Sequence, residues 1–316
     1  MKTLSKNSKI LTAVKPGPGC EQHLQKVYKF AQRFSFDIEL FVVVEPFNDV
    51  YLHTLYGIPA TNTHITSEID ETRVNQTKKL LDKESLNAPS DIKVTTNVVL
   101  GELKESILKR SSEIKAAAIV LGSKNEYGIF DTQLSNTLDI MDEAECPVIV
   151  FPENSEIHPE THMELLVCDD LSSKGMNALV FARSFANEHR GVGINHINII
   201  EEENLHVPEE VSQILLGSIE NSVAPDEKAL VNAAQASLLN RFSLGVSSND
   251  TSSIQYENNA CVGDTYSKIK EYSEKEKADF IVLGEHSLLK VSPFGTGRIS
   301  WNKMVTLKKP IIIAKG

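Results

Sequence analysis

Short apolar runs alternate with amphipathic stretches along the whole chain. The runs are rich in Val, Ile and Leu and lie at 10–14, 38–44, 117–122, 147–152, 165–168, 194–200, 279–284 and 310–316. Continuous apolar runs of this length are typical of strands that are buried on both faces of a parallel sheet. The stretch 20–34 is different, because Leu24, Val27, Tyr28 and Ala31 recur at helical spacing and predict one buried stripe. Alternation of strand and helix predicts right-handed βαβ crossovers and a parallel, doubly wound sheet.

The pattern occurs twice. "KAAAIVLG" begins at Lys115 and "KADFIVLG" begins at Lys277, so their glycines are 162 residues apart (284 − 122). The other landmarks repeat in the same order at nearly the same offset: Gly101 with Gly263, and Pro147 with Pro310. The repeat predicts an α/β chain of two doubly wound parallel-sheet, Rossmann-like domains in tandem. We expect domain 1 at 1–153, a linker at 154–162 and domain 2 at 163–316.

Composition narrows the classes of partner. The formal net charge is −11, which disfavours nucleic acid and anionic membrane surfaces because both require clustered Lys and Arg. No apolar run approaches the length of a membrane span. The four cysteines are far apart in the sequence and form no C-x-x-C pair, which indicates buried thiols in a reducing compartment. We expect a cytoplasmic protein.

The repeated motifs resemble those of a universal stress protein, in its tandem two-domain form. The resemblance rests on Gly101-Glu102 and Gly263-Asp264 after the third strand, on "IVLGS" and "IVLGE" in the fourth, and on "CPVIV" and "KPIII" in the last. It covers nearly the whole chain twice and implies the fold more strongly than an activity. It also implies that the two domains pair as an intramolecular pseudo-dimer, and a homodimer is the further option.

Many members of that family bind ATP with a G-x2-G-x9-G-(S/T) loop, whose glycines allow backbone N–H groups to approach phosphates. In the first copy Gly122 and Ser123 match. Asn125 replaces the second glycine, and Ser135-Asn136 replaces the final Gly-Ser. Lys15 stands where the family has an acidic residue after the first strand. This phosphate-binding loop is incomplete.

The second copy keeps more of the pattern. Asp169 and Asp170 supply the acidic residue, and Gly284 matches, whereas Ser287 replaces the second glycine. A glycine turn of Gly295, Thr296, Gly297 and Arg298 could still hold a phosphate. His286 lies just after the fourth strand, where either a ligand contact or a backbone hydrogen bond fits its position.

Three hypotheses follow. The first is a non-catalytic stress-response protein that binds an unknown small molecule or protein partner and has degenerate ATP motifs. The second is an ATP-binding, slowly hydrolysing switch in domain 2, the domain in which ATP is the candidate cofactor. The third is a carrier of an apolar or lipid-like molecule beneath two apolar connections, which hold Tyr51, Leu52, Leu55, Tyr56 and Ile58, and Val207, Val211, Ile214, Leu215 and Ile219. The pattern assigns no catalytic residue and no metal ligand, and it favours a protein that is not an enzyme.

Overall fold

A computed structural model of the chain forms two compact units, Lys2–Pro159 and Glu160–Gly316. It describes residues 4–17, 19–47, 63–123, 132–155, 157, 162–173, 175–201, 227–244, 254–285, 288–289 and 299–316. Across these ranges we find no helix with the length and apolar character needed to cross a membrane. The two apolar connections lie outside the described residues. The exact domain boundaries, the linker and the pairing of the two domains remain predictions.

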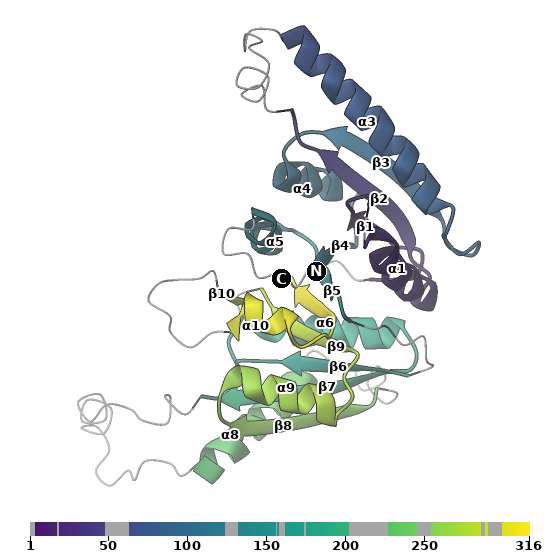
Figure 1. Cartoon of the computed structure of the whole chain (residues 1–316). Helices are drawn as coiled ribbons and strands as arrows, with labels where there is room; N and C mark the ends of the chain where they lie inside the picture. Colours follow the sequence, from purple (N-terminus) through teal and green to yellow (C-terminus); the bar gives the residue numbers. More distant parts are fainter. Residues whose placement is uncertain are drawn as a thin grey trace, which may run out of the picture. The chain divides into compact units, whose positions relative to one another are not determined.

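The N-terminal unit is a five-stranded parallel sheet in the order β3-β2-β1-β4-β5. Its elements along the chain are β1 (Lys9–Ala13), α1 (Cys20–Phe34), β2 (Asp37–Val44), α3 (Thr63–Ser85), β3 (Val94–Leu100), α4 (Leu103–Glu113), β4 (Ala118–Ser123), α5 (Thr132–Glu143) and β5 (Val148–Pro152). Figure 1 shows α3 lying along β2 and β3. The predicted apolar stripe of α1 is confirmed, because Leu24, Val27, Tyr28 and Ala31 are all buried.

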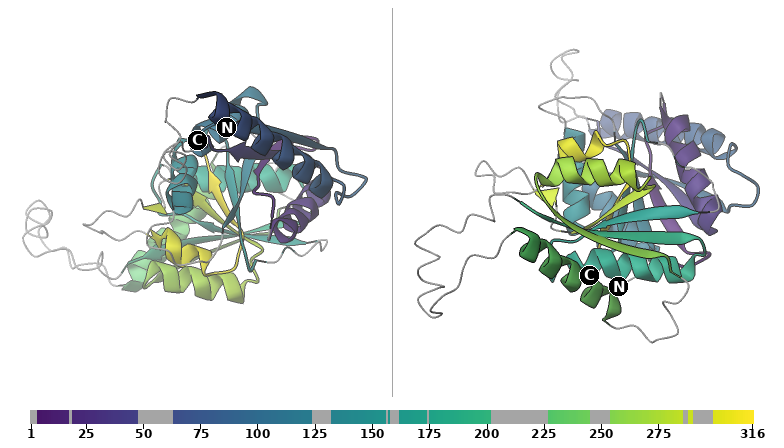
Figure 2. Two further views of the ribbon diagram at one scale, coloured as in Figure 1. Left: turned by 45° about the horizontal axis from the view of Figure 1, so that its top comes forward. Right: turned by 90° about the horizontal axis from the view of Figure 1, so that it is seen from below.

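The C-terminal unit has the same strand order, β8-β7-β6-β9-β12. Its elements are β6 (Met163–Cys168), α6 (Gly175–Glu188), β7 (Val192–Ile200), α8 (Glu227–Ser243), β8 (Tyr256–Val262), α9 (Thr265–Lys275), β9 (Phe280–Gly284), α10 (Trp301–Val305) and β12 (Ile311–Ala314). Two short strands, β10 (Leu288–Leu289) and β11 (Ile299–Ser300), pair separately from this sheet. In the right-hand view of Figure 2, α9 lies on one face of the sheet, and α6 and α8 lie on the other. The predicted fold class is confirmed in both halves.

The two units correspond residue by residue around their central strands. Ala117 N donates to Lys9 O (2.9 Å) in the first unit, and Asp279 N donates to Glu164 O (2.9 Å) in the second. Lys9 and Glu164 therefore occupy equivalent positions. After α4 and α9 the chain turns through Lys115 and Lys277, each with a φ of 51°. This left-handed conformation is uncommon for a side chain other than glycine, Asn or Asp.

Candidate functional site

Open parallel sheets bind ligands beyond the carboxyl ends of their strands, and the described candidate residues lie there. Gly122 and Ser123 end β4, Gly284 ends β9, and Asp169 and Asp170 directly follow β6. The strands β6 and β9 are neighbours, with Cys168 beside Leu283, so the two aspartates and Gly284 lie at one place on this edge. The remaining candidates, His286, Gly295, Thr296, Gly297 and Arg298, lie outside the described residues.

In the N-terminal unit a histidine packs on the strand-end glycine. His23 lies in the first turns of α1, and its Nδ1 would be 3.1 Å from a Cβ placed on Gly122. Its Nε2 is buried and has no hydrogen-bond partner among the described residues. The ring therefore occupies the space in which a ligand would approach the backbone of Gly122.

Burial keeps this imidazole neutral. Loss of hydration lowers the pKa of His23 from 6.5 to about 4, and the positive charge of nearby Lys26 adds to the effect. Lys26 is itself anchored, because its Nζ donates to Pro152 O (2.8 Å) and also to Glu153 O. The carboxyl edge of the N-terminal sheet thus carries a neutral imidazole and an anchored lysine, and Lys15 stands where the family has an acidic residue.

In the C-terminal unit Asp169 is buried, and its own chain satisfies its carboxylate. Oδ2 lies 3.0 Å from His196 Nε2 and 2.8 Å from Arg241 Nε. Oδ1 accepts from Leu171 N (2.8 Å) and from a terminal nitrogen of Arg241 (3.1 Å). Three hydrogen bonds and the ion pair with Arg241 therefore engage both carboxylate oxygens of Asp169 within its own chain.

The network extends inward to a tyrosine. His196 Nδ1 lies 3.0 Å from the Tyr256 hydroxyl, which is 3.3 Å from Leu238 O. Because the Asp169 carboxylate can only accept, His196 Nε2 must carry a proton. Burial and the charge of Asp169 raise the pKa of Tyr256, so its hydroxyl stays protonated. Tyr256 stacks on Phe242 of α8 at 3.6 Å between ring centroids.

Arg241 fastens the loop after β6 to α8. Its terminal nitrogens donate to Leu171 O (2.9 Å) and Ser172 O (2.6 Å) in addition to Asp169. Sequence reasoning missed Arg241, His196, Tyr256 and His23. The one available signal was His196, a polar residue inside the apolar run "INHINII", since a buried histidine needs partners.

Asp170 is the exposed member of the aspartate pair. Its Oδ1 accepts from Ser172 N (3.0 Å) and Ser172 Oγ (2.6 Å). A Cβ on Gly175, the first residue of α6, would come within 2.5 Å of Asp169 Oδ1 and 2.4 Å of Asp170 Oδ1. The two carboxylates therefore lie against the positive end of this helix, where they oppose the binding of an additional anion.

Gly263 has a structural role in the described chain. Its φ of 148° belongs to the region that favours glycine, and it leads into Asp264, whose side chain accepts from Ser267 N (2.9 Å) at the start of α9. The described residues contain no group of three or more His, Cys, Asp or Glu side chains that could hold a metal ion.

Comparison with known proteins places this geometry in context. Residues 6–152 match the model of the Universal stress protein family. No curated protein matches the chain. A universal stress protein from Archaeoglobus fulgidus is 13% identical, with a TM-score of 0.58 over 100% of this chain and 98% of that chain. This likeness shows that the fold is shared along the full length.

Two further solved structures resemble about half of the chain. The universal stress protein UspA from Lactobacillus plantarum is 21% identical over 46% of this chain and 98% of its own, with a TM-score of 0.38. A universal stress protein in complex with cAMP is 12% identical over 49% of this chain and 100% of its own, with a TM-score of 0.31. At these TM-scores neither likeness carries an argument about the ligand of this chain.

Proposed function

We propose that this chain, which belongs to the universal stress protein family through residues 6–152, is a non-catalytic stress-response protein that binds a ligand or partner and does not hold ATP in the family manner. The observation that carries the proposal is that the chain's own side chains engage both strand-end crevices. His23 packs on Gly122 in the first unit, and Arg241 and His196 engage Asp169 in the second.

In the N-terminal unit two requirements for a nucleotide are unmet. A phosphate needs close approach to backbone N–H groups, and the His23 ring lies against the one described glycine at that place. Displacing the ring would expose a buried apolar surface without providing the missing acidic contact, because Lys15 follows β1. Both points support a crevice that no longer accepts ATP.

In the C-terminal unit only Asp170 offers an exposed carboxylate at the end of β6. Using Asp169 instead would break its contacts with Arg241 and His196, and removing one partner of a buried ion pair costs about 3–5 kcal/mol. That cost exceeds what one new hydrogen bond to a ligand returns, which is about 1 kcal/mol. Because the cost of freeing Asp169 is larger than the gain from a ligand contact, we infer that the ATP site of the C-terminal unit is degenerate.

The thiols support a reducing compartment, and we place the protein in the cytoplasm. All four cysteines are free: Cys20, Cys146 and Cys168 are buried and Cys261 is half-buried. Burial raises the pKa of Cys20 to about 11, with the charge of Glu84 as a smaller cause, so this thiol stays protonated and unreactive at neutral pH.

Calorimetric titration of the full chain with Mg-ATP tests the proposal. We expect no binding tighter than about 100 μM, that is, no more than about 5–6 kcal/mol of binding free energy. Mass spectrometry of small molecules released from protein purified without nucleotide is the companion measurement, and we expect no stoichiometric ATP or ADP.

The variant Asp170→Asn separates the outcomes if ATP does bind. Stoichiometric binding that Asp170→Asn abolishes would refute the proposal and establish a nucleotide switch in domain 2. Stoichiometric binding that Asp170→Asn leaves unchanged, but that His23→Phe removes, would refute it in favour of the N-terminal crevice.

A further inference from the structure

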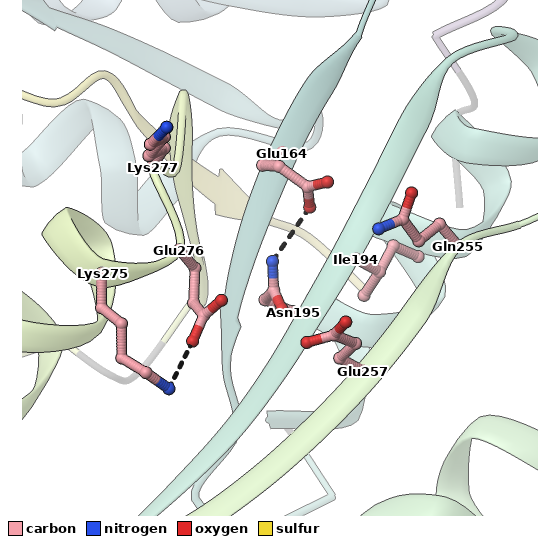
Figure 3. Close-up of a pocket in the computed structure, with 8 residues that line it drawn as sticks. All are labelled: Glu164, Ile194, Asn195, Gln255, Glu257, Lys275, Glu276 and Lys277. Atoms are coloured by element: carbon pink, nitrogen blue, oxygen red, sulfur yellow. Dashed lines mark hydrogen bonds and ion pairs between the residues drawn. The ribbon is translucent and has the colours of Figure 1, made fainter.

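A small polar cavity of about 210 Å³ opens at the other edge of the C-terminal sheet, where the strands begin. Its lining residues come from the starts of β6, β7 and β8 and from the end of α9: Glu164, Ile194, Asn195, Gln255, Glu257, Lys275, Glu276 and Lys277. Figure 3 shows Glu164, Asn195 and Glu257 following one another across the strands, with the Lys275–Glu276 ion pair on the helix side. The cavity holds about seven waters or a small molecule of that size.

Asn195, which lines this cavity, has one side-chain acceptor without a donor among the described residues. The residue is only 6% exposed, and its Nδ2 donates to Glu164 Oε2 (2.9 Å). The amide cannot be turned around, because a carboxylate must face the NH2 group. Its Oδ1 is buried and has no partner among the described residues. An unpaired buried acceptor of this kind destabilises the fold, so a donor from outside the described chain would be stabilising there.

Glu257 makes the same place more acidic. Asn195 and Glu257 are directly opposite each other on β7 and β8, so their side chains share one face of the sheet. Glu164 lies beyond Asn195, and its second carboxylate oxygen contacts His162. Two carboxylates and an amide side chain therefore line the strand side of the cavity, and Lys275, Glu276 and Lys277 line its helix side.

The N-terminal unit shows what fills the corresponding position. There Arg110 of α4 inserts its guanidinium: Nε donates to Glu39 Oε1 (2.6 Å) and a terminal nitrogen to Glu39 Oε2 (3.2 Å). The other terminal nitrogen donates to Glu113 Oε2 (3.1 Å), and Lys9 Nζ lies 3.8 Å from Glu39. Glu39 is 3% exposed, so this is a buried carboxylate paired with the chain's own guanidinium.

The C-terminal unit has lost both of these cations. Tyr272 is the eighth residue of α9, as Arg110 is of α4, and Glu164 stands in the place of Lys9. The acid has also moved by one strand. Asn195 takes the place of Glu39, beside the central strand, and Glu257 takes that of Thr95. The acceptors thus remain in the second unit without the guanidinium that pairs with them in the first.

We propose that the cavity lined by Glu164, Asn195 and Glu257 binds a small molecule that carries a guanidinium or primary ammonium group. The cationic head donates to Asn195 Oδ1 and to the Glu257 carboxylate, as Arg110 donates to Glu39. A planar guanidinium suits this place best, because its fork of N–H donors can bridge two acceptors. The site goes beyond the proposed function, since it lies at the opposite edge from the crevice and is independent of ATP.

Calorimetric titration of the full chain at moderate salt tests the proposal with three probes. Agmatine carries both a guanidinium and a primary ammonium, butylamine carries the ammonium alone, and N-butylurea is a neutral analogue that carries neither charge. We expect agmatine to bind once per chain and N-butylurea not to bind. Glu257→Gln should weaken agmatine binding at least tenfold. Tyr272→Arg should abolish it, because the introduced guanidinium fills the cavity as Arg110 does in the other unit.

Glu271→Gln is the matched control. Glu271 lies on the same helix and pairs with Lys268 outside the cavity, so the change removes an equal charge from α9 and should leave binding unchanged. Agmatine should also raise the melting temperature of the wild type but not of Tyr272→Arg.

Four results would each overturn the proposal. They are no saturable binding of agmatine or butylamine, equal binding of N-butylurea, unchanged affinity in both Glu257→Gln and Tyr272→Arg, and binding confined to arginine-containing peptides. The ATP titration is unaffected by any of them, so the two proposals fail separately.

Discussion

Two buried histidines in this chain are held in opposite ways. His196 is enclosed between Asp169 and Tyr256 and uses both ring nitrogens. His23 packs against Gly122, and its buried Nε2 has no partner among the described residues. The first is an element of a polar network, whereas the second is tolerated only while it is neutral. This difference makes the second a source of acid sensitivity.

The pH dependence of stability follows from the lowered pKa of His23. The unfolded side chain takes up a proton near pH 6.5, but the folded one does so only near pH 4. The unfolded state therefore binds more protons in this window, and stability falls as the pH drops from about 6.5 to 4. We expect His23→Phe to remove on the order of 2–3 kcal/mol of this acid-induced loss. Urea unfolding at a series of pH values measures it.

A wild-type profile that matched the His23→Phe profile between pH 4 and 6.5 would contradict the assignment.

The Asp169 network predicts an unequal response of two adjacent aspartates. Asp169→Asn removes the charge that Arg241 and His196 share, leaving a guanidinium partly buried without its partner. We expect it to lower the free energy of unfolding by about 3 kcal/mol. Asp170→Asn should cost under about 1 kcal/mol, since Asn can still accept from Ser172 at an exposed turn. Equal losses in chemical denaturation would argue against the network.

At the scale of elements, α4 and α9 begin differently although they occupy the same position. Asp264 caps α9 by accepting from Ser267 N (2.9 Å), whereas Glu102 makes no side-chain cap of α4. Asp264→Ala should therefore destabilise the chain by about 1 kcal/mol at neutral pH, and Glu102→Ala by much less. Equal melting temperatures for the two variants would count against this difference.

The same cap has a pH signature. Hydrogen bonds from the Ser267 hydroxyl and then from its backbone N–H lower the pKa of Asp264 below 3.8. The stabilisation is present above that value and disappears as the pH falls through the folded-state pKa. The difference between wild type and Asp264→Ala should therefore shrink below about pH 4, measured by thermal unfolding.

Local patterns predicted most of these elements. The stripe of Leu24, Val27, Tyr28 and Ala31 predicted α1, because burial repeats at the helical period. The repeated Gly122 and Gly284 marked the same strand end in both copies. By contrast, the partners of Asp169 could not be predicted, since Arg241 is 72 residues away and reaches it only once α8 packs beneath β7 and β8.

The absence of a guanidinium beside Asn195 among the described residues, at the place that corresponds to Arg110 in the first unit, could not be predicted from the sequence either. Arg110 and Tyr272 differ as many helix positions differ between the two copies. Only the side-chain placement reveals that Arg110 lies on a buried Glu39 and that Asn195 Oδ1 lacks a donor. Strand register, which side-chain period alone leaves open, brings Asn195 opposite Glu257.

At the scale of the whole molecule, the order of strands predicts which backbone amides are best protected against local unfolding. β1 and β6 are flanked by strands on both sides and are largely buried, whereas β3 and β8 pair with one neighbour each in the described part of the chain and are mostly half-buried. We expect amides of 10–13 and 165–168 to exchange slowest with deuterium, and those of 94–100 and 256–262 to exchange at least tenfold faster. Slower exchange in β3 or β8 would contradict this ranking.

The two units differ in whether the cation beside their buried acceptors comes from the chain or from solution. In the N-terminal unit Arg110 supplies the guanidinium from the chain itself, so the buried Glu39 needs no cation from solution. The C-terminal unit, with its guanidinium replaced by Tyr272, gains stability only in proportion to the logarithm of a free ligand's concentration. Through these positions, a change in the concentration of small cations would therefore change the stability of the C-terminal unit but not that of the N-terminal unit. The relative stability of two otherwise similar folds would then depend on the concentration of the ligand.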